Sequence, residues 1–171
     1  FRRGSRYENI MGVLVHGFEL DLRYDWSDRL VISGNLTQQN VLNNEKYDAV
    51  GNPKRIYRER LPNTPYFFWN LNASYAMLKE PGVMGLSMFY SVNYVHEFYL
   101  GYKSVATGGE KNTIPTQVAN NVGVTVSSPD RRTTVTLEGT NIFNARAFDN
   151  FNIQKPGRAL YVKLRYNLNS L

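Results

Sequence analysis

The sequence of 171 residues contains no cysteine and carries a formal net charge of +6. The lack of thiols excludes a disulfide framework and a thiolate metal site. Because the basic residues are dispersed along the chain with no RNA-binding motif, the positive charge does not predict a nucleic-acid partner. No apolar run is long enough for a transmembrane helix, but membrane-spanning β-strands need only short alternating segments.

The first predicted strand, residues 14 to 26, alternates between apolar and charged side chains. Its apolar face carries Phe18, Leu20, Leu22, Tyr24 and Trp26. Its other face carries Glu19, Asp21, Arg23 and Asp25. Because side chains alternate along a strand, this pattern places one face in an apolar medium and the other in water. Unpaired charges are costly inside a soluble sandwich but suit the wet lumen of a membrane barrel.

Further strands follow, and their connections alternate between short and long. The strands are predicted at residues 30–40, 66–77, 84–97, 116–127 and 133–143. The short connections are Ser27-Asp28-Arg29, Lys79-Glu80-Pro81-Gly82 and Ser128-Pro129-Asp130. The long connections have a loop composition rich in Gly, Pro and Asn, and they span residues 41–65, 98–115 and 144–157.

The last predicted strand follows Pro156-Gly157 and runs almost to the end of the chain. Its apolar face carries Leu160, Val162, Leu164, Tyr166 and Leu168, and its polar face carries Tyr161, Lys163, Arg165 and Asn167. Every short turn falls on the side of the C-terminus, and every long loop falls on the other side. Outer-membrane barrels place short turns in the periplasm and long loops outside. The fold class predicted is therefore an all-β, antiparallel transmembrane β-barrel wall.

Six charged side chains are expected on the lumen face, where they would contact one another or a plug domain. They are Glu19, Asp21, Arg23, Glu138, Lys163 and Arg165. Their mixed signs favour ion pairs within the wall or to a plug, and in a wet lumen each pair contributes little stability. A structural role is preferred over substrate contact.

Ligand contacts are expected from the long loops. In the first, Lys54, Arg55, Arg58 and Arg60 are interleaved with Tyr57. Such a basic and aromatic cluster can attract an anionic ferric chelate or the phosphates of lipopolysaccharide, although a solvated loop has the same composition. Further candidates are Tyr99, Tyr102 and Lys103 in the second loop, and Phe148, Asn150 and Phe151 in the last. Aromatic residues near a membrane also form interfacial belts.

An enzyme is not predicted, and neither is a metal or a cofactor. The two histidines, His16 and His96, lie beside alternating strands, where solvated or interfacial side chains are expected. No nucleophile motif accompanies them.

Several motifs near the end of the chain resemble the closing segment of TonB-dependent outer-membrane receptors. These are Gly139-Thr140-Asn141-Ile142-Phe143-Asn144, Phe148-Asp149-Asn150-Phe151 and Pro156-Gly157-Arg158. Upstream, Tyr7-Glu8-Asn9-Ile10, Gly17-Phe18-Glu19-Leu20 and Asp28-Arg29-Leu30 resemble the family's strand-to-turn pattern. Members commonly end on an aromatic residue, whereas this chain ends Asn169-Ser170-Leu171.

The resemblance implies a 22-stranded barrel with a plugged lumen, of which residues 1–171 would be about seven C-terminal strands. We therefore expect an incomplete barrel with no plug domain. The implied function is active import of a scarce nutrient, a ferric siderophore first, with haem, cobalamin or a glycan behind it. The implied partners are outer-membrane lipid and lipopolysaccharide, the plug domain of the same full-length chain, the TonB complex that supplies energy, and the small-molecule or metal-chelate substrate. The implied location is the outer membrane, with the C-terminus on the periplasmic side.

Two other interpretations remain open. A complete eight-stranded barrel fits this length, with residues 1 to 10 adding part of a strand, and would have a structural or adhesive role. A soluble β-sandwich binding module shows the same alternation.

Overall fold

The computed structural model describes residues 12–105, 113–149 and 153–168, and these contain nine β-strands and no helix. The long strands are β1 (Val13–Asp25), β2 (Leu30–Asn43), β3 (Phe67–Leu78), β4 (Gly85–Val95), β7 (Gln117–Ser127), β8 (Thr133–Thr140) and β9 (Ala159–Tyr166). Two short strands, β5 (Phe98–Tyr99) and β6 (Thr113–Ile114), form a separate ribbon. Within these ranges no helix is available that is long and apolar enough to cross a membrane.

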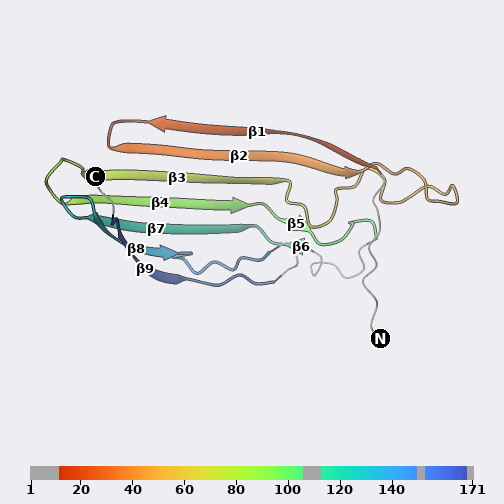
Figure 1. Cartoon of the computed structure of the whole chain (residues 1–171). Coiled ribbons are helices and arrows are strands. Elements are labelled where there is room, and N and C mark those ends of the chain that lie inside the picture. Colours follow the sequence, from red (N-terminus) through yellow and green to blue (C-terminus); the bar gives the residue numbers. More distant parts are fainter. Residues whose placement is uncertain (1–11, 106–112, 150–152, 169–171) are drawn as a thin grey trace.

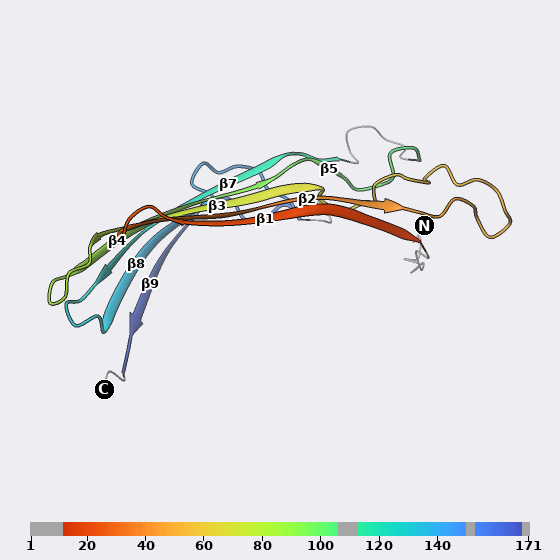
Figure 2. The ribbon, with the colours of Figure 1, turned by 90° about the horizontal axis from the view of Figure 1, so that it is seen from above.

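The seven long strands form one antiparallel sheet in the order β1-β2-β3-β4-β7-β8-β9, which confirms the predicted strand number and connectivity. The short turns lie at one end of the sheet and the long loops at the other (Figure 1). Seen from above, the sheet is a single curved layer from which β8 and β9 swing away (Figure 2). In the part of the chain that the structure describes, β1 and β9 are the two edges of this sheet and no strand joins them.

The strand register places the predicted apolar rows on one face. One row joins Leu20, Leu36, Trp69, Tyr94 and Val118, and the next but one joins Tyr24, Ile32, Ala73, Tyr90, Val122, Gly139 and Leu160. Leu160, Val162 and Leu164 are 70%, 71% and 73% exposed. Among the described residues the only buried apolar side chains are Phe98 and Ile114, outside the main sheet. The sheet therefore has no core of its own, and its apolar face requires a non-aqueous medium or a partner.

The single layer differs from both alternative folds, the soluble β-sandwich and the complete eight-stranded barrel. A β-sandwich buries the apolar faces of two sheets against each other, and the described residues form no second sheet that could cover this one. An eight-stranded barrel would require β1 and β9 to be joined, directly or through another strand, whereas here they are separate edges.

The face opposite the apolar one, called the inner face below, is mostly polar. Its side chains form hydrogen bonds from strand to strand. The Asn70 Nδ2 atom donates to Asn35 Oδ1 at 2.8 Å, and Asn121 Nδ2 donates to Ser91 Oγ at 3.0 Å. Further along this face the hydroxyls of Thr125 and Thr136 lie 2.9 Å apart. Polar residues on one face and apolar residues on the other are the pattern of a wall between water and lipid.

Ion pairs connect neighbouring short turns. Lys79 pairs with Asp28 at 2.5 Å, and Arg29 pairs with Glu80 at 2.6 Å. Hydrogen bonding to the Lys79 ammonium lowers the pKa of Asp28 below its ordinary value of 3.8. The guanidinium of Arg131, in the next turn, donates to the carbonyl oxygen of Glu80 at 3.1 Å. These exposed contacts contribute little energy individually but hold three turns in register.

Two features of the strands differ from the sequence prediction. The strand predicted to reach residue 143 ends at Thr140, because Asn141 adopts a left-handed backbone with φ of 46°. Its side chain is buried and hydrogen-bonds both the amide and the carbonyl of Ala145, which turns the chain. The ribbon of β5 and β6 was not predicted, and it encloses Phe98 and Ile114 beside the long loops.

Gly123 lies on the inner face opposite Phe89, whose ring covers it. A Cβ atom at Gly123 would lie 2.3 Å from two carbon atoms of this ring, so the ring would have to rotate away. We expect Gly123→Val to lower the free energy of unfolding by about 1–3 kcal/mol, the usual cost of overpacking. The measurement is the urea unfolding midpoint of the full protein in lipid vesicles. With Phe89→Ala already present, the same substitution should cost much less, and an equal cost in both backgrounds would contradict this packing.

Candidate ligand-binding surface

The first long loop folds back on the end of β2. The amide of Asn43 donates to the carbonyl oxygen of Glu59 at 2.8 Å, and the amide of Leu61 donates to the carbonyl oxygen of Val41 at 2.8 Å. At the tip, the Asp48 carboxylate accepts hydrogen bonds from the amides of Val50 and Asn52 at 2.9 and 2.8 Å. The loop is thus a hairpin held by its own backbone, which presents its side chains in defined positions.

The second long loop packs against this hairpin. The amide of Asn63 donates to the carbonyl oxygen of Tyr99 at 2.8 Å, and the amide of Ser104 donates to Glu59 Oε2 at 3.2 Å. The buried Asn43 side chain donates from Nδ2 to the hydroxyl of Tyr102 at 3.2 Å. The two groups of predicted ligand residues, in residues 54–60 and 99–103, therefore lie on adjoining loops and form one surface.

A cavity of about 260 Å³ lies at the junction of the two loops, lined by Glu59, Arg60, Tyr99, Gly101 and Lys103. This volume is below the range of about 300–1,000 Å³ typical of sites for whole small molecules. The junction is large enough for one ring or lobe of a small molecule. Glu59 and Gly101 were not predicted, since nothing in the local sequence indicates that the two loops meet.

The structure separates the four basic residues of the first loop. Lys54 forms an ion pair with Glu45 and is part-buried. The guanidinium of Arg60 lies 3.7 Å from the centre of the Tyr66 ring, and its Nε donates to Asn40 Oδ1 at 3.1 Å. Among the described residues, Arg55 and Arg58 have no carboxylate partner, and Lys103 of the second loop has none either.

Arg60 lies on the side of the sheet that carries the apolar face. Arg60 forms an antiparallel β-bridge with Leu42, whose side chain lies on the apolar face of β2. Its side chain donates a hydrogen bond to that of Asn40, which lies opposite His16 in the strand register on the same face. Just below, Phe67, Trp69, Tyr94 and His96 form an aromatic cluster in which Trp69 and Tyr94 stack at 5.3 Å. Aromatic side chains of this kind are typical of membrane interfaces, and Arg60 and both histidines lie on the same side of the sheet as this cluster.

Arg58 and Tyr57 form a local pair, with the guanidinium carbon 5.4 Å from the ring centre. Hydrogen bonding to Arg58, and its charge, lower the pKa of Tyr57 below its ordinary value of 10.0. Lys103 lies 6.0 Å from the centre of the Tyr99 ring. A cation–π contact holds a cation beside a neutral ring, which does not cancel its charge.

The six predicted lumen residues all occupy inward positions of the register. Lys163 pairs with Glu138, and Arg23 pairs with Asp25 at 3.1 Å. Arg165 donates to Asn167 at 3.2 Å. Glu19 and Asp21 have no basic partner among the described residues, although Asp21 faces an amide row that includes Asn35 and Asn70. Four of the six therefore have a partner within the wall, and contact of Glu19 and Asp21 with a plug stays a prediction.

The last long loop is pinned by amide side chains. The Phe148 amide donates to Gln117 Oε1 at 2.7 Å, and the Arg158 amide donates to Asn144 Oδ1 at 3.0 Å. Asn150 and Phe151, also predicted as ligand candidates, lie outside the described residues. Within the described ranges no cluster of three His, Asp or Glu residues is arranged to hold a metal ion.

No family model and no curated protein matches the sequence. Solved structures do match. A mutant of the ferric enterobactin receptor from Pseudomonas aeruginosa aligns with 92% of this chain and 23% of its own, with a TM-score of 0.70 and 19% identity. The FrpB iron transporter from Neisseria meningitidis aligns with 90% of this chain and 24% of its own, with a TM-score of 0.63 and 14% identity.

These likenesses confirm the predicted all-β antiparallel wall, and they confirm the resemblance to receptor barrels at the level of the fold. The chain spans about a quarter of the length of either solved protein.

Proposed function

We propose that this chain is part of the barrel wall of a TonB-dependent outer-membrane receptor that imports a scarce nutrient. The observation that carries the proposal is the single-layer sheet, apolar on one face and hydrogen-bonded polar on the other, whose long loops meet in a folded, cationic surface. A wall of this kind requires lipid outside and water inside. The aromatic cluster around Trp69 and Tyr94 supports a membrane interface just below the loops.

The proposed substrate is an anionic ferric siderophore. Arg55, Arg58 and Lys103 supply positive charge without carboxylate partners among the described residues, and Tyr57 and Tyr99 supply aromatic surface beside them. A cationic surface raises the local concentration of an anionic ligand and speeds its capture. The names of the two solved proteins, a ferric enterobactin receptor and an iron transporter, agree with iron as cargo. Haem, cobalamin and a glycan are the competing substrates.

The remaining parts of the proposal concern orientation and partners. The short turns would lie in the periplasm, together with the end of β9, and the long loops would lie outside the cell. Glu19 and Asp21 would face a plug domain supplied by the same full-length chain. Energy would come from the TonB complex, and no catalytic step on the substrate is involved.

The test is uptake by cells that make the full protein. An antibody to residues 41–65 should detect, in the outer-membrane fraction, a polypeptide several times longer than 171 residues. Deletion of the gene should abolish uptake of a radiolabelled ferric siderophore under iron limitation. Collapse of the proton gradient should stop uptake in the parent cells while surface binding persists. A soluble product, or unchanged uptake in the deletion strain, would reject the proposal.

A further inference from the structure

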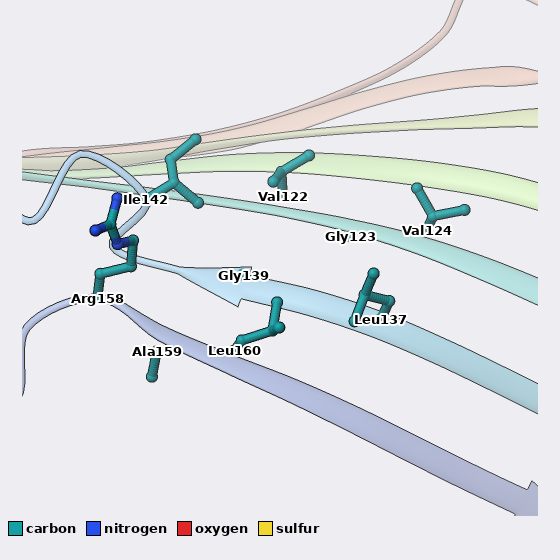
Figure 3. A pocket seen from close by; sticks show the side chains of 9 residues that line it. All are labelled: Val122, Gly123, Val124, Leu137, Gly139, Ile142, Arg158, Ala159 and Leu160. Carbon is teal, nitrogen blue, oxygen red and sulfur yellow. The ribbon is translucent and has the colours of Figure 1, made fainter.

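A groove of about 500 Å³ crosses β7, β8 and the start of β9 on the apolar face (Figure 3). Its apolar lining is Val122, Val124, Leu137, Gly139, Ile142 and Leu160. Gly139 lies between Val122 and Leu160 in one outward row of the register, and it has no side chain to fill the space. The groove lies where this glycine stands between two larger apolar residues, and the Ile142 side chain borders it, 3.1 Å from where a Cβ atom of residue 139 would lie.

One end of the groove carries a cation. Arg158 lines it, and the close-up shows its guanidinium group at the end where Ile142 lies (Figure 3). Arg158 directly precedes β9, so this end is the one next to the last long loop. In the proposed orientation, the groove lies in the outer half of the membrane and Arg158 lies at its surface.

Two more cations belong to the base of the same loop. The amide of Lys155 donates to the carbonyl oxygen of Ala147 at 2.8 Å. Because Ala147 directly follows Arg146, this hydrogen bond places Lys155 and Arg146 on neighbouring segments of the loop. Arg146, Lys155 and Arg158 are exposed, and none has a carboxylate partner among the described residues. The one acidic residue of the loop, Asp149, accepts a hydrogen bond from the amide of Ile153 at 2.8 Å.

We propose that this groove binds a phosphorylated acyl lipid of the outer leaflet, of the lipid A type. One acyl chain lies along Gly139, and a phosphate group contacts Arg158 with support from Arg146 and Lys155. Arginine binds phosphate through two parallel hydrogen bonds, and basic pockets beside apolar grooves recognise anionic lipid head groups. This inference rests on the proposed function for its membrane orientation.

A second groove on the apolar face provides an internal comparison. It has a volume of about 470 Å³, contains Gly34 and is lined by Leu22, Ile32 and Leu71 among others. Its lining includes no charged residue. It can hold an acyl chain but offers no cation for a phosphate, so head-group selectivity is expected only at the groove of Gly139.

The experiment titrates the purified full-length protein in detergent micelles with bisphosphorylated lipid A and with the same lipid after removal of both phosphates. Bound lipid is counted by native mass spectrometry. Arg158→Gln should weaken binding of the phosphorylated lipid about tenfold, the effect of one charge-assisted hydrogen bond, and leave the dephosphorylated lipid unchanged. Arg165→Gln, the same change on the inner face of β9, is the matched control and should affect neither lipid.

Filling the groove tests the acyl contact. Gly139→Leu should weaken binding of both lipids, and Val122→Phe is a second variant that reduces the same space without adding a Cβ beside Ile142. The inference is overturned if Arg158→Gln and Arg165→Gln behave alike, or if both groove variants bind lipid normally. It is also overturned if inorganic phosphate at equal concentration displaces the lipid, because the site would then recognise free phosphate. Normal siderophore uptake with no lipid selectivity would reject the lipid site alone, whereas lipid selectivity without uptake would reject the transport proposal alone.

Discussion

Replacement of Leu164 by arginine should lower the free energy of unfolding in a bilayer by about 2–4 kcal/mol, the cost of a basic side chain on the lipid face near mid-membrane. Leu164 lies on the apolar face of β9, paired with Val135, and is 73% exposed in the isolated sheet. No protein group among the described residues covers it, so lipid would have to solvate the guanidinium. The measurement is the unfolding free energy of the full protein in phospholipid vesicles by denaturant titration.

The matched control is Tyr161→Arg on the same strand. Tyr161 faces inward and is paired with Glu138, so an arginine there meets water and a carboxylate. Its effect should stay within about 0.5 kcal/mol, as for other surface substitutions. A cost near zero at both positions would mean that both faces are in water, and the membrane wall would have to be abandoned.

The faces of the seven strands could be predicted because the alternation has period two and is carried by strong contrasts, such as Leu164 beside Lys163 and Arg165. The turns could be predicted because Pro, Gly and Asp are concentrated there. The ribbon of β5 and β6 could not, since strands of two residues have no periodicity. The early end of β8 depends on the buried network of Asn141, whose partners are known only after folding.

The candidate site was less predictable than the fold. The basic and aromatic composition of the loops predicted which residue types would form the site. It did not predict which side chains they would contact. The ion pair between Lys54 and Glu45 spans a hairpin, and the contact of Arg60 with Tyr66 depends on where that hairpin rests on β2. Glu59 has no local signal, because its role is to receive the second loop at Ser104. Sequence periodicity therefore does not predict contacts between loops that are distant in the sequence.

The triple variant Arg55→Gln, Arg58→Gln, Lys103→Gln is expected to weaken binding of an anionic ferric catecholate about 10- to 100-fold. Loss of one charge-assisted hydrogen bond, worth about 1.5–3 kcal/mol, accounts for this range. The remaining affinity should depend less steeply on salt than in the parent, because fewer exposed charges attract the ligand. The measurement is equilibrium binding of the radiolabelled chelate to cells at low temperature, where uptake is halted.

Two comparisons decide whether the charges act as contacts or merely shape the loop. The pair Glu45→Gln and Lys54→Gln removes an ion pair from the same hairpin with no change of net charge, and it should leave affinity nearly unchanged. A cationic ferric hydroxamate should bind the triple variant at least as well as the parent, since the repulsion has been removed. If the triple variant binds the anionic chelate as tightly as the parent does, the cationic surface of the two loops is not the substrate site. If the paired variant loses as much affinity as the triple variant, the loop's fold rather than its charge is what the ligand requires.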